Sequence, residues 1–290
     1  MKEQTITRET VSQFENHLRM EEKAQNTIEK YIRDITAFAE YLCGKAISKE
    51  LAIAYKQHLQ DSGYAVRSIN SIIASINALF GFVGLYNCRL KSLKIQKQIY
   101  CPEEKELTKT EYVRLINAAK YKKNERLSLL IQTICGTGIR VSELQYITVE
   151  AVKSGEAVVS LKGKTRTVFI VRELRQKLLR YAAEQEIKSG LIFITRTGKP
   201  LSRTNIWREM KSLCESAGVN PQKVFPHNLR HLFARVFYSI EKDIAKLADI
   251  LGHSSINTTR IYIIATGNEH RKRMENMRLI VSNPFSELLQ

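Results

Sequence analysis

The sequence predicts a mainly α-helical protein of two domains that carries one small β-hairpin. Apolar residues recur at the spacing of an amphipathic helix along most of the chain. Only two short β-branched runs, Ala157–Leu161 and Thr167–Val171, depart from that spacing. A chain of 290 residues, 43% of them apolar, also has enough material for a packed core in each of two domains.

The first domain, residues 1–95, is expected to be a small bundle of amphipathic helices. Its apolar positions form successive helical faces: Val11, Phe14 and Leu18; Ile28, Tyr31, Ile32, Ile35, Phe38, Ala39 and Leu42; Leu51, Ala52, Tyr55 and Leu59; and Ile69, Ile72, Ile73, Ile76, Leu79, Phe80 and Val83. Residues 96–107 lose this periodicity and carry a proline and mixed charges. They are expected to be a linker.

The second domain is expected to span residues 108–280, with a tail at 281–290. Thr108 and Glu111 have the spacing of a capping box, which marks the start of a helix. The next helix should end at Gly136 to Gly138, and a hairpin with a basic tip at residues 162–166 should follow. Further helices are expected at about 172–187, 204–217, 227–240 and 244–251.

The composition favours a polyanionic partner. Lys and Arg number 46 against 29 Asp and Glu, so the formal charge is +17 and the pI about 9.7. Nucleic acid is the first candidate. A membrane surface is the rival, but the chain has no long apolar span and no one-sided basic amphipathic helix. The N-terminus lacks the apolar core of a signal peptide, so a cytoplasmic protein is expected.

Two motifs in the last third of the chain carry chemistry. One is the run from Pro226 to His231, and the other runs from Leu251 through His253 to Tyr262. Guanidinium groups bind phosphate oxygens bidentately, imidazoles transfer protons, and a phenol can act as a nucleophile. Asp and Glu do not cluster with His at ligand spacing, so the residues predict phosphodiester chemistry with no metal and no other cofactor.

Together with Arg140 and the basic hairpin, these motifs resemble the tyrosine recombinase (phage integrase) family. They occur in the family's order, and the chain is most similar to Xer-like and transposon integrase-type members. The resemblance implies a helical, SAM-like core-binding domain and a mixed α/β catalytic domain, which form a C-shaped clamp around DNA. It also implies an enzyme that cleaves and rejoins duplex DNA through a 3′-phosphotyrosyl intermediate.

Residue roles follow from the chemistry and the resemblance together. Arg140 and Arg230 are expected to hold the phosphate, and Tyr262 to attack it. The resemblance gives His227 general acid/base work and His253 a hydrogen bond to the phosphate, although the sequence alone does not separate these two tasks. His231 is expected to point to another face and to be structural.

Supporting and DNA-contacting residues are expected elsewhere. Glu143 resembles the family's acidic partner of the first arginine. Lys162 best matches the family's lysine, which protonates the leaving 5′ oxygen, and Lys164 remains open because the hairpin is one residue short. Candidates for DNA contact are Arg67, Asn70 and Asn77 on the exposed side of one helix, and Arg203 and Arg208 near Ser202, a predicted N-cap.

The expected partners are double-stranded DNA and further copies of the chain. The resemblance implies a dimer on each core site, a tetramer in the synapse, and exchange of the C-terminal tail between protomers in a cytoplasmic, nucleoid-associated protein. The activity would be integration and excision of a mobile element or resolution of chromosome dimers. Two alternatives remain open: a type IB topoisomerase-like strand transferase and a non-catalytic DNA-binding accessory protein.

Overall fold

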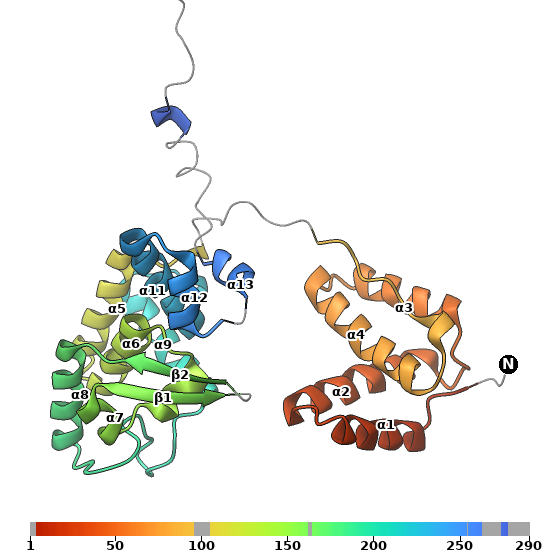
Figure 1. Ribbon diagram of the computed structural model, residues 1–290, viewed down its shortest axis with the longest axis horizontal. Coiled ribbons are helices and arrows are strands. Elements are labelled where there is room, and N and C mark those ends of the chain that lie inside the picture. The colour runs from red at the N-terminus through yellow and green to blue at the C-terminus, as the bar shows by residue number, and fades with distance from the viewer. Residues whose placement is uncertain (1–3, 96–104, 162–163, 254, 263–273, 278–290) are drawn as a thin grey trace, which may run out of the picture. The chain divides into compact units, whose positions relative to one another are not determined.

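The computed structural model describes residues 4–95, 105–161, 164–253, 255–262 and 274–277. The chain divides into two compact units, Met1–Lys97 and Gln98–Gln290 (Figure 1). Each unit has its own hydrophobic core. In the described ranges the fold is mainly helical with one antiparallel two-stranded sheet, as the sequence predicts. No helix in these ranges is both long and apolar enough to cross a membrane.

The first unit is the expected helical bundle. It contains α1 (Arg8–Met20), α2 (Gln25–Leu42), α3 (Lys49–Asp61), α4 (Val66–Phe82) and the short 3₁₀ helix η1 (Tyr86–Cys88). The side chains of Thr7 and Ser48 accept hydrogen bonds from the first turns of α1 and α3, which satisfies backbone donors there. The predicted apolar faces meet in the core, where Phe14, Ile35, Phe38, Ile76 and Phe80 are fully buried.

The expectation that Asn70 and Asn77 lie on the exposed side of α4 is wrong. Both are half-buried, and each pairs reciprocally with a backbone unit beyond η1. The Asn77 amide donates to the Leu90 carbonyl (2.9 Å) and accepts from the Leu90 N–H (2.8 Å). Asn70 makes the same pair with Leu93, at 2.9 and 2.7 Å. The two side chains therefore fasten the segment after η1 to α4, because an asparagine amide can replace a missing backbone partner.

The second unit begins before the expected boundary at residue 108. Leu107 is buried in the core of this unit, and the Lys105 carbonyl accepts a hydrogen bond from Asn228. Glu106 forms an ion pair with Arg235. The end of the predicted linker is thus part of the second unit. The sequence did not indicate this, because Glu106 and Leu107 contact residues that are distant in the chain.

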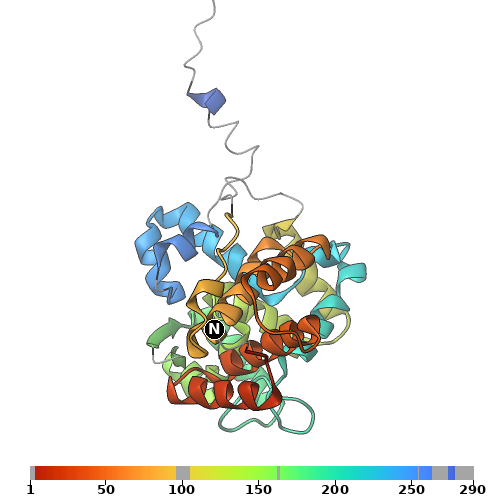
Figure 2. The same cartoon turned by 90° about the vertical axis from the view of Figure 1, so that its right-hand side faces the viewer.

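The second unit then runs through α5 (Lys109–Tyr121), α6 (Glu125–Thr137), η3 (Val141–Tyr146), α7 (Val149–Ser154), β1 (Glu156–Leu161), β2 (Lys164–Phe169), α8 (Arg172–Glu184), α9 (Arg203–Lys211), α10 (Cys214–Ala217), η4 (Pro221–Lys223), α11 (Pro226–Glu241), α12 (Ile244–Leu251) and α13 (Ile256–Arg260). The predicted capping box of Thr108 and Glu111 starts α5. Helix α11 packs on α6 and α12. Both views show α12 and α13 side by side (Figures 1 and 2).

The hairpin is tighter than predicted, because the second strand starts at Lys164 instead of Thr167. Val159 pairs with Arg166 and Ala157 with Val168 across the ladder. Ala157, Val159 and Val168 are buried, so Arg166 lies on the inward face. Arg166 was predicted to lie in the basic tip because charged residues are more common in loops than on the inward face of a strand.

The single helix predicted at residues 204–217 is two helices. Helix α9 begins after Ser202, which is the predicted N-cap, and ends at Lys211. The Ser212 hydroxyl donates to the Glu209 carbonyl (2.8 Å), a local bond that competes with the helical ladder. A short helix, α10, follows and ends at Gly218.

Candidate active site

Arg140 is placed by the end of α6. Gly138 ends this helix with φ +64°, a conformation that favours glycine, and Arg140 then precedes η3. Glu143 accepts hydrogen bonds from the Arg140 backbone N–H (2.9 Å) and from its Nη1 (2.8 Å). The expected contact between Arg140 and Glu143 is therefore present, and the carboxylate that makes it is only 1% exposed.

Arg230 is a fully buried arginine at 1% exposure on α11. Pro226 occupies the first turn of this helix, where its missing N–H costs no hydrogen bond. The Arg230 guanidinium donates to the carbonyls of Gly138 and Leu251 (the latter at 2.7 Å), and it lies 2.9 Å from His253 Nε2. In the described part of the chain its Nε has no hydrogen-bond acceptor. Because Arg230 also lines the cavity described below, its guanidinium can bind an anionic ligand there.

His253 and Tyr262 follow the ends of α12 and α13. Gly252 ends α12 with φ +63°, and the Nδ1 of His253 lies 2.8 Å from the Thr259 hydroxyl on α13. Tyr262 follows α13 and is 5% exposed, and its Oη lies 3.4 Å from His227 Nε2. Its ring stacks on that of His253, with centroids 5.2 Å apart. The phenol is thus held among imidazoles in the same chain.

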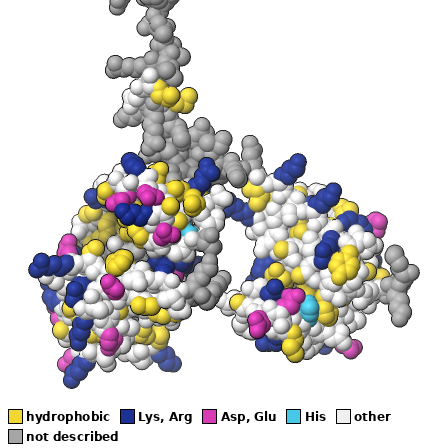
Figure 3. Space-filling view, in the orientation of Figure 1, with side chains coloured by type: hydrophobic (Ala, Val, Ile, Leu, Met, Phe, Trp, Pro, Cys, Tyr) yellow, Lys and Arg dark blue, Asp and Glu magenta, His cyan; other side chains and the backbone are white. Residues whose placement is uncertain are grey.

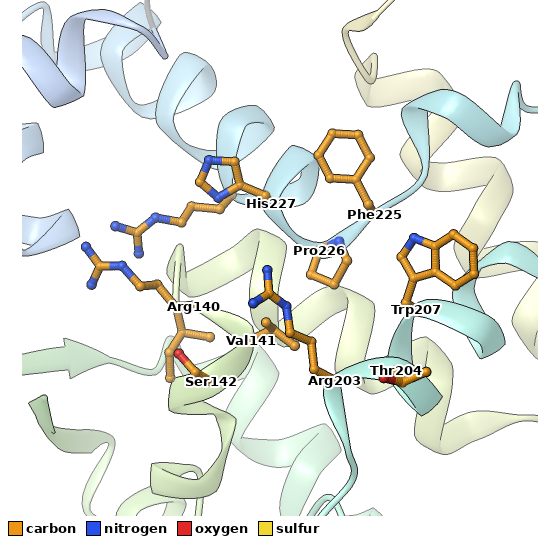
Figure 4. A pocket seen from close by; sticks show the side chains of 11 residues that line it. Arg140, Val141, Ser142, Arg203, Thr204, Trp207, Phe225, Pro226 and His227 are labelled. Atoms are coloured by element: carbon orange, nitrogen blue, oxygen red, sulfur yellow. The ribbon is translucent and has the colours of Figure 1, made fainter. Parts of the chain in front are cut away.

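Arg140, His227 and Arg230 also line a cavity of about 610 Å³, together with Arg203, Trp207 and Phe225, among others. Figure 4 shows Arg140 and His227 on one side of the pocket, Trp207 on the other, and Arg203 between them. Arg203 was expected near DNA and lies in this pocket. Trp207, which belongs to no motif of the sequence, also lines the pocket and is 49% exposed.

The surroundings of the site lower the pKa of two imidazoles and of Arg230. Burial and the nearby Arg230 and Arg140 lower the pKa of His227 and lower that of His253 to about 4. Burial and Arg140 lower the pKa of Arg230 to about 10, so it remains a cation at neutral pH. A neutral His227 beside a phenol can accept its proton, and an entering phosphate would raise the pKa of that imidazole.

His231 was expected to point to another face, but its ring lies against those of His227 and Tyr262. Its ring centroid lies 4.2 Å from that of Tyr262 and 4.8 Å from that of His227. The spacing of four residues from His227 is the signal that the sequence analysis missed, because residues i and i+4 share a helical face. Burial, with His227 and Arg230 nearby, lowers the pKa of His231 to about 4.

Other expected residues are separate from this cluster or lie outside the described structure. Arg67 on α4 and Arg208 on α9 are exposed. Lys162 lies outside the described residues, and so does the side chain of Lys164. Within the described ranges, no three His, Cys, Asp or Glu side chains come together as a metal site would require.

The fold and this cluster of arginine, histidine and tyrosine define a class of protein, an enzyme that acts on phosphodiesters. Comparison with known families agrees. The model of the phage integrase family matches residues 105–269, and that of the phage integrase N-terminal SAM-like domain matches residues 11–84. The chain belongs to the phage integrase family. It is a tyrosine recombinase, an enzyme of DNA cleavage and rejoining.

A relative of known sequence supports this assignment, and solved structures share the fold. Tyrosine recombinase XerA of Pyrococcus furiosus is 32% identical over 97% of this chain and 98% of its own length. The XerH site-specific recombinase bound to a difH substrate aligns with a TM-score of 0.67 at 20% identity, over 95% of this chain and 91% of that one. A lambda integrase dimer bound to a COC′ core site aligns at 0.71 and 20% identity, over 90% and 78%.

Proposed function

We propose that this recombinase cleaves duplex DNA with Tyr262 as the nucleophile. The observation that carries the proposal is the Tyr262 Oη at 3.4 Å from His227 Nε2, beside the cavity that Arg140 and Arg230 line. Arg140 and Arg230 hold the non-bridging oxygens of the scissile phosphate, and His253, which contacts Arg230, contributes a further hydrogen bond. Glu143 keeps Arg140 in place.

In the proposed reaction the Tyr262 oxygen attacks phosphorus as its proton passes to His227. The bond between phosphorus and the 5′ oxygen breaks, and that oxygen leaves with a proton, for which Lys162 and Lys164 are the candidate donors. The products are a 3′-phosphotyrosyl ester and a free 5′ hydroxyl. A 5′ hydroxyl from another strand reverses the steps, so the exchange needs no external energy source.

Duplex DNA is the proposed substrate. The charge of +17 and the Lys and Arg side chains spread over the visible face of both units (Figure 3) support contacts to the phosphate backbone. Arg203 lies in the pocket, and the exposed Arg67 and Arg208 are further candidates for DNA contact. The first unit serves as the core-binding domain. Asn70 and Asn77 are left out of this set, because their amides hold the chain after η1.

Assembly on DNA belongs to the same proposal. One structural relative is a dimer on its core site, so we propose that this chain pairs on each site and that two pairs form the synapse. The tail at residues 281–290, expected to pass between protomers, lies outside the described residues. A protein with this substrate works on the nucleoid in the cytoplasm. No observation favours a topoisomerase or a non-catalytic regulator.

The test is covalent capture. The full chain is incubated with sheared genomic DNA of its source organism, detergent-resistant protein–DNA adducts are isolated, and the trapped ends are sequenced. We expect adducts at one class of site, with a 3′ phosphate on Tyr262 identified by peptide mass spectrometry. Tyr262→Phe should form no adduct and still retain the captured duplex in a gel-shift assay.

Tyr238→Phe is the matched control, since Tyr238 packs against the same small hydrophobic cluster as Tyr262. It should form adducts like the unaltered chain. Adducts that persist in Tyr262→Phe would assign the nucleophile elsewhere. If the unaltered chain forms no adduct at all, the proposed function is wrong.

A further inference from the structure

Three arginines bind three successive carbonyl groups at the end of α12. Arg166 donates to the Ile250 carbonyl (2.7 Å), Arg230 to that of Leu251 (2.7 Å) and Arg140 to that of Gly252 (3.3 Å). The last carbonyls of a helix have no partner within the helix and carry its negative partial charge. The end of α12 therefore gathers guanidinium groups that come from β2, α11 and the residue before η3.

Arg166 also shares a carboxylate with Arg140. Its Nη2 donates to Glu143 Oε2 at 2.7 Å, and Arg140 donates to Glu143 Oε1 at 2.8 Å. The Arg140 side chain is 34% exposed and lines the cavity, whereas that of Arg166 is 13% exposed and does not line it. Arg166 is thus the covered member of the pair, and Arg140 is the open one.

We propose that Arg166 is a positioning residue for strand cleavage, which acts through Glu143 and α12 to keep Arg140 aimed at the scissile phosphate. This inference rests on the proposed function. With two guanidiniums on one carboxylate, the cluster keeps a positive charge for the substrate. Without Arg166, Glu143 would pair with Arg140 alone, draw its side chain from the phosphate and offset more of its attraction for the phosphate.

The glycine of the motif at residues 251–253 fits this role. A Cβ on Gly252 would overlap the Arg166 Cδ and would lie 2.8 Å from its Nε. The close approach of this backbone to Arg166 therefore requires a residue without a side chain. Gly252 also has φ +63°, so the same residue allows both the end of α12 and the passage of Arg166 beneath it.

Stability alone does not explain Arg166. In the described residues its buried Nε has no acceptor, and burying a cation with an unpaired donor opposes folding. An apolar side chain would fill the inward face of β2 without this cost. The guanidinium is needed because two of its nitrogens point to different acceptors, the carboxylate of Glu143 and the Ile250 carbonyl.

The experiment measures single-turnover cleavage on a nicked duplex that carries the captured site. We expect Arg166→Gln to lower the cleavage rate at saturating DNA about 10–100-fold, with duplex affinity unchanged. Arg166→Lys, which keeps the charge beside Glu143, should lie between this variant and the unaltered chain. Arg175→Gln is the matched control, because Arg175 also bonds to a backbone carbonyl, that of Lys153, and lines no part of the cavity. It should cleave normally.

A double-variant cycle distinguishes positioning from a general structural role. If Arg166 acts through Glu143, then Glu143→Gln combined with Arg166→Gln should lose no more activity than the worse of the two single variants. Two effects that multiply would overturn the inference, and so would cleavage by Arg166→Gln at the rate of Arg175→Gln. Either result leaves the proposed function intact as long as the unaltered chain forms its adduct through Tyr262.

Discussion

Gly138→Ala should destabilise the second unit by an amount that the local geometry sets. Gly138 has φ +64°, where an alanine costs roughly 1–2 kcal/mol. A Cβ there would also lie 2.5 Å from Phe233 Cδ1 and 3.0 Å from Leu251 Cδ2. Such overpacking of a core adds about 1–3 kcal/mol. The expected loss in the free energy of unfolding is therefore about 2–5 kcal/mol.

The assay is denaturant unfolding followed by the fluorescence of Trp207, the only tryptophan of the chain, which lies in the second unit. Gly198→Ala is the matched control, because Gly198 has φ +76° and nothing within 4 Å of an added Cβ. Gly198→Ala should therefore lose only the free energy of unfolding that the positive φ costs an alanine. The Gly138 variant should also cleave more slowly, since the Gly138 carbonyl binds Arg230. Equal losses in the two variants would refute the steric part of the reasoning.

Two further predictions concern pH and the first unit. The pKa of His231 and of His253 is lowered to about 4, below the unfolded value of about 6.5, so the unfolded chain binds more protons between these values. Stability should therefore fall by about 2 kcal/mol for each histidine, or about 4 kcal/mol for the pair, between pH 7 and pH 5. His231→Phe should flatten this dependence in Trp207-monitored unfolding, and an unchanged slope would contradict the assignment. In the first unit, Asn77→Ala removes both bonds to Leu90 and should destabilise that unit by about 1–3 kcal/mol, measured by hydrogen exchange at residues 89–93. Arg67→Ala, on the same helix, should leave exchange unchanged and weaken DNA binding, and the reverse pattern would show that these two roles are wrongly assigned.

The candidate phosphate-binding residues lie in local sequence motifs. The motifs containing Arg140, His227, Arg230 and His253 are short runs in which a glycine or a proline sets the backbone beside a charged or titratable group. Such runs form the same local backbone in different folds, because helix ends and their caps are determined by residues close in sequence. The identities of the candidate residues were therefore visible before the fold.

The partners of those residues were not visible. The sequence placed Asn77 on an exposed helix side, Arg166 in a basic tip and His231 on another face, and the structure places all three differently. Arg140 and the Gly252 carbonyl are 112 residues apart, and Arg166 and the Ile250 carbonyl are 84 apart. Contacts of this kind depend on strand register and helix packing, which no local spacing encodes.

By itself, the sequence determined the two helical units, the hairpin, the family and the chemical groups available for strand transfer. It could do so because hydrophobic periodicity and short motifs reflect interactions between near neighbours. The tertiary structure alone decided which arginine faces the cavity and which lies beneath it, since both are cations of the same type. Both arginines bind the Glu143 carboxylate and carbonyls at the end of α12, but Arg166 is the more deeply buried of the two.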